Sequence, residues 1–245
     1  MARYKAILEY DGTDFLGFQR QAVGRTVQGE VEAALARVGW QGQPVLGAGR
    51  TDTGVHAAGQ VIAFDLDWNH GEAGLLRALN ANLPRDVAVK MVAGCAPDFH
   101  PRFRAQSRRY RYTIYNVPVR TPLVERYAWQ VWPALDAAAM QAASAALVGR
   151  HDFAAFGADP DDGDSTIRTV IQAEWSVGDP NWLYFDIRAD AFLYRMVRSL
   201  VGALKRVGTG GLTVEGFSAI LRSRDRNQGP ATAPAHGLCL MEVVY

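Results

Sequence analysis

Hydrophobic and polar positions change from strand-like alternation to helical spacing, and back, along the first hundred residues. Residues 3–10 alternate, which predicts a strand that ends at the turn Asp11-Gly12. Thr26 can cap a helix over 27–38, where apolar residues recur at helical spacing. By the same criteria we expect strands at 44–49, 57–65 and 86–93 and a second helix at 71–81. The predicted order is β-α-β-β-α-β, the split βαβ unit of ferredoxin-like folds.

The second half of the chain repeats this order of elements without repeating the sequence. We expect strands at 108–116, 167–177, 182–190 and 238–245 and helices at 135–148, 192–207 and 213–223. The predicted fold class is α+β, with two ferredoxin-like (RRM-like) halves of mostly antiparallel sheet. We place the halves at residues 1–105 and 106–245. An acidic loop at 158–164 has no packing potential, and the sequence assigns it no role.

Composition limits the classes of protein that need to be considered. The 245 residues are 49% hydrophobic, enough to bury a core, and the net charge of +1 means that a nucleic acid would have to meet a local basic patch. Cys95 and Cys239 lie far apart, and the five histidines lack ligand spacing, so neither a disulfide framework nor a metal site is expected. No segment approaches the roughly 18 apolar residues of a membrane span. We expect a cytoplasmic globular protein.

A glycine-rich loop between two predicted strands carries a single acid. Four glycines fall between residues 47 and 59, and Asp52 lies two residues after Arg50 and two before Gly54. Glycine permits a sharp bend or the close approach of another group, and a neighbouring cation favours the ionised form of a carboxylate. Asp52 is therefore a candidate reactive group. An aspartate that only closes an Asx turn is the commoner case for such a loop, and spacing alone leaves both interpretations open.

The segment from Phe99 to Tyr112 contains five arginines, no acid and several aromatic rings. This composition is typical of phosphate contacts made beside base stacking. In a strand, Tyr110 and Tyr112 would share one face, and Arg109 and Arg111 the other. An ordinary sheet with one buried and one solvated face would show the same pattern, so the segment alone does not decide between the two.

A third stretch places one arginine beside an apolar helical stripe. Apolar residues between Leu193 and Leu204 keep helical spacing, and Arg198 lies on the flank of the stripe rather than opposite it. Such a residue can bury its stem and offer its guanidinium group to a nearby acid. A surface arginine at an apolar boundary is the commoner case for any one position of this kind.

Taken together, these motifs resemble the TruA family of tRNA pseudouridine synthases. The resemblance rests first on Gly49-Arg-Thr-Asp-Thr-Gly-Val-His56, Arg108-Arg-Tyr-Arg-Tyr-Thr-Ile-Tyr-Asn116 and Met196-Val-Arg198. Further matches follow in order along the chain: Glu9-Tyr-Asp-Gly12, Gly17-Phe-Gln-Arg-Gln21, Asn80-Ala-Asn-Leu-Pro84, Asp98-Phe-His-Pro-Arg-Phe103, His151-Asp-Phe153 and Gly237-Leu-Cys-Leu-Met241. Two departures are small: Thr53 stands where many members have Ala, and Phe18 where many have Trp.

The resemblance implies an isomerase that converts uridine to pseudouridine at positions 38, 39 and 40 of the tRNA anticodon stem-loop. It implies a homodimer with a central positively charged cleft, tRNA as partner, and no cofactor, metal or membrane. The nucleophile of the family matches Asp52, its base-stacking tyrosine matches Tyr110, and the arginine that pairs with the nucleophile matches Arg198. Further candidates for substrate contacts are Arg20, Arg50, His56, Arg109 and Arg111.

These residue types suit a reaction that breaks the C1′–N1 bond, turns the base and rejoins it through C5. A carboxylate can attack C1′ or C6, or act as a base at C2′, and the sequence does not choose among these. A bidentate arginine would keep the carboxylate ionised. A tyrosine ring beneath the detached base would hold it by stacking worth about 1–3 kcal/mol. A paired uridine must first leave its stack, which costs a few kcal/mol.

Two other functions compete with this interpretation. An RNA-binding or chaperone protein without catalysis would use the same arginine-aromatic surface, but it leaves the Asp52 loop unexplained. A glycosidase acting on nucleosides would need two carboxylates within about 5–10 Å, whereas the loop offers one.

Overall fold

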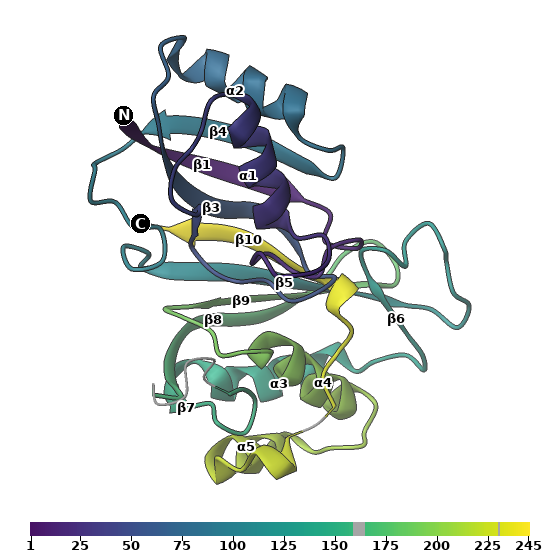
Figure 1. The fold of residues 1–245 in the computed structure, drawn as a ribbon. Coiled ribbons are helices and arrows are strands. Elements are labelled where there is room, and N and C mark those ends of the chain that lie inside the picture. The colour runs from purple at the N-terminus through teal and green to yellow at the C-terminus, as the bar shows by residue number, and fades with distance from the viewer. Residues whose placement is uncertain (159–164, 230) are drawn as a thin grey trace. The chain divides into compact units, whose positions relative to one another are not determined.

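The computed structural model describes residues 1–158, 165–229 and 231–245, so the predicted acidic loop lies outside the described residues except for Ala158. The chain divides into two compact units, Met1–Gln106 with Cys239–Tyr245, and Ser107–Leu238. Figure 1 shows the strands and helices of each unit along the colour bar. The closing strand of the chain therefore belongs to the first unit. The predicted division of the chain into halves at residue 105 stays a prediction.

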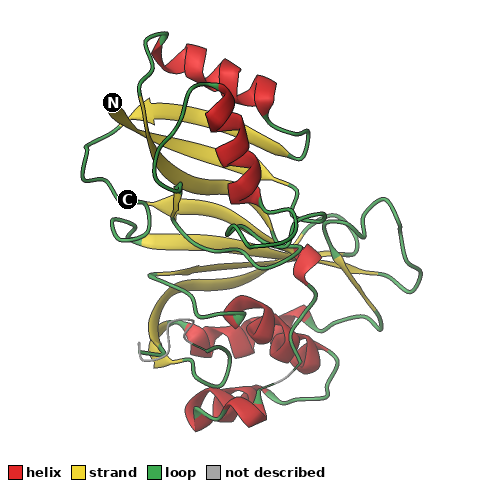
Figure 2. Ribbon diagram, viewed as in Figure 1, coloured by secondary structure: helices red, strands yellow, loops and turns green. Residues whose placement is uncertain are grey.

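The first unit consists of a sheet and two helices. Its elements are β1 (Ala2–Tyr10), α1 (Val27–Arg37), β2 (Leu46–Gly47), β3 (His56–Leu66), α2 (Gly71–Asn82), β4 (Val87–Gly94) and β10 (Leu238–Val244). β1 lies between β4 and β3 and is antiparallel to both. On the other side of β3, β2 pairs antiparallel and β10 pairs parallel. Figure 2 shows both helices on one side of these strands.

The first unit follows from the sequence pattern at close to residue level. Alternate residues of β1 from Tyr4 to Tyr10 are buried, as the alternation predicted. The hydroxyl of Thr26 accepts a hydrogen bond from the Gly29 amide at 3.3 Å, which confirms the predicted cap of α1. After α1, Gly39 takes a φ of +94°, the left-handed conformation that commonly ends a helix.

The second unit contains a sheet with three helices. Its elements are β5 (Ser107–Asn116), β6 (Trp129–Val131), α3 (Ala137–Ser144), β7 (Gly149–Asp152), β8 (Ile167–Val177), β9 (Trp182–Ala189), α4 (Met196–Gly208) and α5 (Val214–Ser223), with single 3-10 turns at Ala145–Leu147, Arg226–Gln228 and Ala235–Gly237. The order β5-β9-β8-β7 is antiparallel throughout, and β6 pairs parallel with β5. The α+β class with mostly antiparallel sheets is therefore confirmed. The central positive cleft stays a prediction.

Several predicted boundaries were wrong, and local hydrogen bonds explain two of them. The helix expected from residue 192 begins at Met196, because Arg195 adopts a left-handed φ of 59° and the Tyr194 amide donates to the Ala158 carbonyl. The strand expected at 44–49 shrinks to two residues, since the Val45 amide donates to the buried carboxylate of Glu32 at 3.0 Å. The helix expected over 135–148 ends at residue 144 and continues as a 3-10 turn.

Candidate active site

The Asp52 loop is a tight turn between β2 and β3. The Val55 amide donates to the Asp52 carbonyl at 3.1 Å, which closes a four-residue turn. The third residue of that turn, Gly54, has a φ of +77°, where a side chain would be strained. Asp52 itself is half-buried. The glycine spacing seen in the sequence thus has a local cause, and it places the acid at the first position of a fixed turn.

The loop between β1 and α1 holds the backbone of the Asp52 turn by backbone hydrogen bonds. The Phe18 amide donates to the Thr51 carbonyl at 3.0 Å, and the Gly54 amide donates to the Phe15 carbonyl at 3.4 Å. A Cβ added at Gly17 would lie 2.7 Å from the Thr51 carbonyl oxygen. The two loops are therefore in direct backbone contact, which only glycine permits at this point.

Hydrogen bonds from buried polar side chains also hold this turn. The Tyr10 hydroxyl lies 2.8 Å from the Thr51 hydroxyl, with Tyr10 3% and Thr51 6% exposed. Gln60, which is fully buried, donates its side-chain amide to the Gly49 carbonyl at 2.9 Å. Buried hydrogen bonds of this kind fix a backbone because breaking them leaves unsatisfied polar atoms.

His56 follows the turn and is buried at 6% exposure. Its Nδ1 lies 3.0 Å from the Gly12 amide and 3.2 Å from Asp11 Oδ1. An ion pair with Asp11 would need a proton on Nδ1, but the Gly12 N–H can only donate, so Nδ1 accepts and Nε2 carries the proton. The Asp11 carboxylate is meanwhile occupied by the Thr13 amide and hydroxyl. His56 thus orders the entry to β3, while its contact with substrate stays a prediction.

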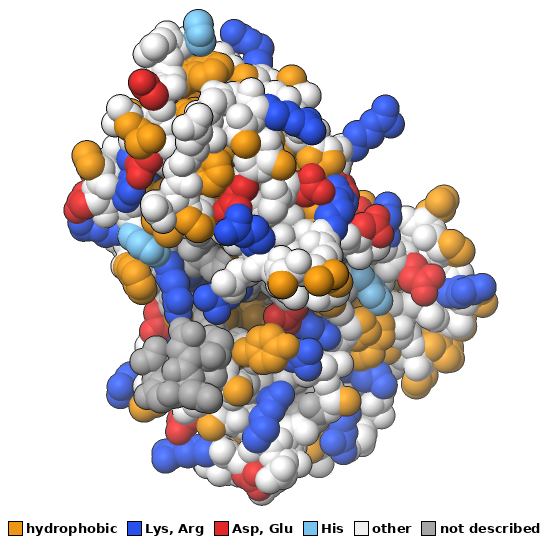
Figure 3. Space-filling view, viewed as in Figure 1, with side chains coloured by type: hydrophobic (Ala, Val, Ile, Leu, Met, Phe, Trp, Pro, Cys, Tyr) orange, Lys and Arg blue, Asp and Glu red, His pale blue; other side chains and the backbone are white. Residues whose placement is uncertain are grey.

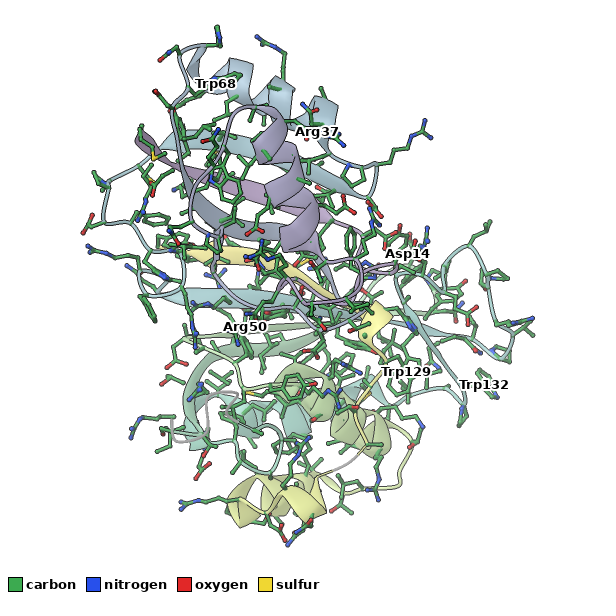
Figure 4. All side chains as sticks on the ribbon, viewed as in Figure 1. Asp14, Arg37, Arg50, Trp68, Trp129 and Trp132 are labelled. Atoms are coloured by element: carbon green, nitrogen blue, oxygen red, sulfur yellow. The ribbon has the colours of Figure 1, made fainter. Side chains whose placement is uncertain are left out.

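The two basic candidates of the first unit differ in how their charge is compensated. Arg20 Nη1 donates to the carboxylate of the buried Glu32 at 2.8 Å. Arg50 is exposed and, across the described ranges of the chain, makes no hydrogen bond or ion pair (Figure 4). Of the two, Arg50 presents the less compensated charge.

In the second unit, the predicted alternation of β5 is confirmed. Tyr110 (9% exposed) and Tyr112 (fully buried) lie on the covered face, and Arg109 and Arg111 are half-buried on the other. The Tyr110 ring meets Phe192 edge to face, with centroids 5.0 Å apart and an interplanar angle of 84°. This geometry is favourable for aromatic pairs and fixes the tilt of the Tyr110 ring.

Arg109 and Arg111 share one carboxylate. Arg109 donates to Asp186 at 3.0 Å, and Arg111 donates to it at 2.8 Å. The Arg111 guanidinium also lies over the Tyr184 ring, 5.2 Å from its centroid. Asp186 on β9 is directly opposite Arg111 in the antiparallel register. Part of the positive charge predicted to face phosphates is therefore neutralised within the strand pair.

Arg198 is fixed on α4 by a segment that crosses the helix. Its Nε donates to the Ala233 carbonyl at 2.8 Å, and its own carbonyl accepts from the Ala233 amide at 3.0 Å. The crossing is close at Gly202, where an added Cβ would lie 2.1 Å from the Ala231 carbonyl oxygen. The flank position predicted for Arg198 is confirmed, since the apolar stripe is buried and Arg198 is half-buried.

Tyr112 lies under the same crossing segment. Its hydroxyl donates to the Pro234 carbonyl at 2.8 Å. Burial raises the pKa of Tyr112, and the positive charge of Arg198 partly offsets that rise. The phenol therefore stays protonated and acts as a structural donor.

Asp52 belongs to the first unit, and Tyr110 and Arg198 belong to the second. Their meeting in one site stays a prediction. Figure 3 shows lysine and arginine side chains interspersed with acidic ones on the visible face. Among the described residues, no group of three or more His, Cys, Asp or Glu is placed to hold a metal ion, and no helix is long and apolar enough to cross a membrane.

Sequence reasoning did not assign roles to Tyr10, Gln60, Phe192 or Asp186. Tyr10 lies in the quoted motif Glu9-Tyr-Asp-Gly12 and Phe192 lies next to the apolar stripe, but neither position showed which residue it contacts. No sequence pattern pointed to Asp186, because its pairing with Arg111 depends on the register of two strands.

The chain was compared with proteins of known sequence and structure. A family profile described as tRNA pseudouridine synthase matches residues 6–104 and 143–245. The tRNA pseudouridine synthase A of Syntrophotalea carbinolica is 44% identical over 245 residues, covering 100% of this chain and 97% of the relative. That of Solidesulfovibrio magneticus is 45% identical, covering 100% and 92%, and that of Neisseria meningitidis is 41% identical, covering 99% and 92%.

Among solved structures, the chain is similar to one of the archaeal box H/ACA sRNP Nop10-Cbf5 complex. The TM-score is 0.39 at 12% identity, and the match covers 83% of this chain but 43% of the other. A Cbf5-Nop10-Gar1 complex matches with a TM-score of 0.36 at 10% identity, covering 82% and 44%. The chain thus spans less than half of these solved chains.

Proposed function

The chain belongs to the tRNA pseudouridine synthase family of isomerases, and from this premise we propose that it converts uridine to pseudouridine at positions 38, 39 and 40 of the tRNA anticodon stem-loop, with Asp52 as nucleophile. The observation that carries the assignment of Asp52 is the turn that bears it. Backbone hydrogen bonds and buried hydroxyl and amide groups fix this turn. The acid that it bears is therefore preorganised for attack.

The proposed first step is nucleophilic. The ionised carboxylate of Asp52 adds to C1′ of the ribose or to C6 of the uracil, and the C1′–N1 bond breaks. The base turns and forms the new bond from C5 to C1′, and the bond to Asp52 breaks, which releases the carboxylate unchanged. C5 then loses its proton, and N1, freed from the sugar, gains one. The overall reaction is an isomerisation, so atoms and charge balance without a further reactant.

Tyr110 is proposed to retain the detached base by stacking. Its support is the ring orientation set by Phe192, which keeps one aromatic plane at a defined tilt. Stacking of this kind is worth about 1–3 kcal/mol per base. The Tyr110 hydroxyl is a further candidate for accepting the proton from C5.

Arg198 is proposed to pair with the Asp52 carboxylate and keep it ionised during the reaction. In support, the Nε atom of its guanidinium group donates to the Ala233 carbonyl, so this group has restricted freedom before substrate arrives. Such restriction lowers the conformational entropy that pairing would otherwise cost.

Among the basic candidates, we propose Arg50 as the main phosphate contact. Arg20, Arg109 and Arg111 already pair with carboxylates in the chain, so their contribution to tRNA binding is smaller. We further propose that the enzyme acts as a homodimer in the cytoplasm, with His56 supporting the substrate-binding loop.

The decisive test uses unmodified tRNA transcript and no added cofactor, with pseudouridine mapped by chemical probing. The wild-type protein is expected to modify positions 38 to 40. Asp52→Asn is expected to yield no product while binding tRNA with unchanged affinity. Asp67→Asn, which changes an exposed carboxylate of the same unit, is the matched control and should keep full activity. Full activity of Asp52→Asn would remove the proposal, and binding without any modification by the wild type would favour a non-catalytic RNA-binding protein.

A further inference from the structure

We propose that the Tyr10 hydroxyl is a positioning group for the reaction, acting through Thr51 on the carboxylate of Asp52. The inference rests on the proposed function, because it assumes that Asp52 is the nucleophile. Tyr10 does not touch the substrate in this scheme. It holds Thr51 in place and thereby sets the direction in which the carboxylate of the following residue, Asp52, points.

The contact is short and shielded from water. The two hydroxyl oxygens of Tyr10 and Thr51 lie 2.8 Å apart, and both residues are buried. Tyr10 is the last residue of β1, and the pairing of β1 with β3 shifts by one residue between Leu8 and Tyr10. Such irregularities change the aim of a side chain at a strand end. Here Tyr10 lies opposite Ala57 in the register and contacts the turn that precedes β3.

Thr51 transmits this contact to the backbone because its side chain is branched at Cβ. A threonine has few χ1 rotamers, so fixing its hydroxyl oxygen restrains the orientation of its own peptide. The Thr51 carbonyl is fixed separately by the Phe18 amide at 3.0 Å. The residue directly before Asp52 is thus held at two atoms by two different elements, and Asp52 follows across a rigid peptide.

The other buried contacts of the loop act farther from the acid. Gln60 donates a hydrogen bond to the carbonyl of Gly49, which lies three residues before Asp52. His56, which lies four residues after Asp52, accepts a hydrogen bond from the Gly12 amide. Loss of the Tyr10 hydroxyl would therefore leave the ends of the loop in place and loosen its centre. A displacement of about 1 Å at a reacting group can cost about 100-fold in rate.

The test compares four single variants and one double variant, Tyr10→Phe with Thr51→Val, for single-turnover rate on tRNA transcript, tRNA affinity and thermal stability. Tyr10→Phe removes one hydroxyl, Thr51→Val removes the other, and Thr51→Ser keeps the hydroxyl. Tyr4→Phe is the matched control, since it makes the same change on the same strand and the Tyr4 hydroxyl has no hydrogen bond within the described residues.

Tyr10→Phe and Thr51→Val are each expected to slow the single-turnover rate by about 10- to 100-fold with tRNA affinity unchanged. The double variant is expected to be no slower than either single variant, because both remove the same contact. Thr51→Ser keeps the hydroxyl but loses the branch at Cβ, so its rate is expected to fall between those of Thr51→Val and the wild type. Tyr4→Phe is expected to retain the full rate.

Four outcomes separate the conclusions. If Tyr10→Phe and Thr51→Val lose thermal stability but keep the wild-type rate, the hydroxyl pair is structural only and the inference is overturned. The same conclusion follows if the two rate losses multiply in the double variant. If Asp52→Asn is active, the proposed function fails first; if Asp52→Asn is inactive while Tyr10→Phe is unimpaired, only the positioning role is lost.

Discussion

Replacing Gly17 by alanine tests how far the loop before α1 controls the Asp52 turn. Gly17 has a φ of +104°, and an added Cβ would lie 2.7 Å from the Thr51 carbonyl oxygen. Ordinary contact begins at 3.4 Å, so one of the two loops must move by about 0.7 Å. The obstacle is a backbone oxygen, which cannot rotate away as a flexible side chain would.

Two costs combine at this position. A positive φ in a non-glycine residue costs about 1–3 kcal/mol. Moving the Thr51 carbonyl also weakens its 3.0 Å hydrogen bond from the Phe18 amide, which is worth about 1 kcal/mol. Gly17→Ala is therefore expected to lower the free energy of unfolding by about 2–4 kcal/mol, within the range that a folded domain survives. A shift of this size next to Asp52 is expected to slow the reaction by about 10-fold or more.

Gly39→Ala is the matched control. Gly39 has a similar φ of +94°, and an added Cβ would meet nothing within 4 Å. It therefore carries the conformational cost alone, about 1–3 kcal/mol, with no effect on rate. Thermal unfolding and single-turnover pseudouridine formation would be measured for both variants. Equal stability losses, or a wild-type rate for Gly17→Ala, would refute the argument that contact between the loops holds the turn.

Three further predictions concern charge. Hydrogen bonding to Arg25 lowers the pKa of Asp86, so this pair stabilises the fold above about pH 4 and the effect is lost as pH falls further. The difference in melting temperature between wild type and Asp86→Asn should therefore shrink below that pH. Burial raises the pKa of Tyr112, so wild-type stability should fall as pH rises above about 10, whereas Tyr112→Phe should lack this fall; parallel pH curves would contradict it. Arg50→Ala should reduce the slope of log affinity for tRNA against log salt by about 1, whereas Arg111→Ala should change it less; equal changes would show that the in-chain ion pair does not matter.

Local pattern was enough to predict the longer elements of the first unit, whereas the strand expected at 44–49 is only Leu46–Gly47. Thr26 marks the start of α1 by chemistry that acts within a few residues, and it caps the helix as expected. β1 is recognisable because its alternation reflects one buried face. The short strands β6 and β7 were missed, since three or four residues carry no period.

The candidate site was predictable only in part. Residue types and spacing marked Asp52 as a candidate and left its role open. The resemblance gave roles to Asp52 and Tyr110, and these roles stay predictions. The contacts that support them come from segments distant in sequence, such as Tyr10 with Thr51 and Phe192 with Tyr110. These depend on strand register and loop packing, which a one-residue slip would change.

The position of β10 has a consequence for how the protein is made. The last strand pairs with β3 at His56 and Ala57, and the Val244 carbonyl accepts from the Gln106 amide. During synthesis, the first hundred residues leave the ribosome long before this strand exists, so the edge of β3 beside the Asp52 turn stays uncovered until Cys239 and Leu240 have emerged. An uncovered strand edge is a template for wrong pairing. Chains truncated before residue 239 should therefore aggregate more readily than the chain that includes β10.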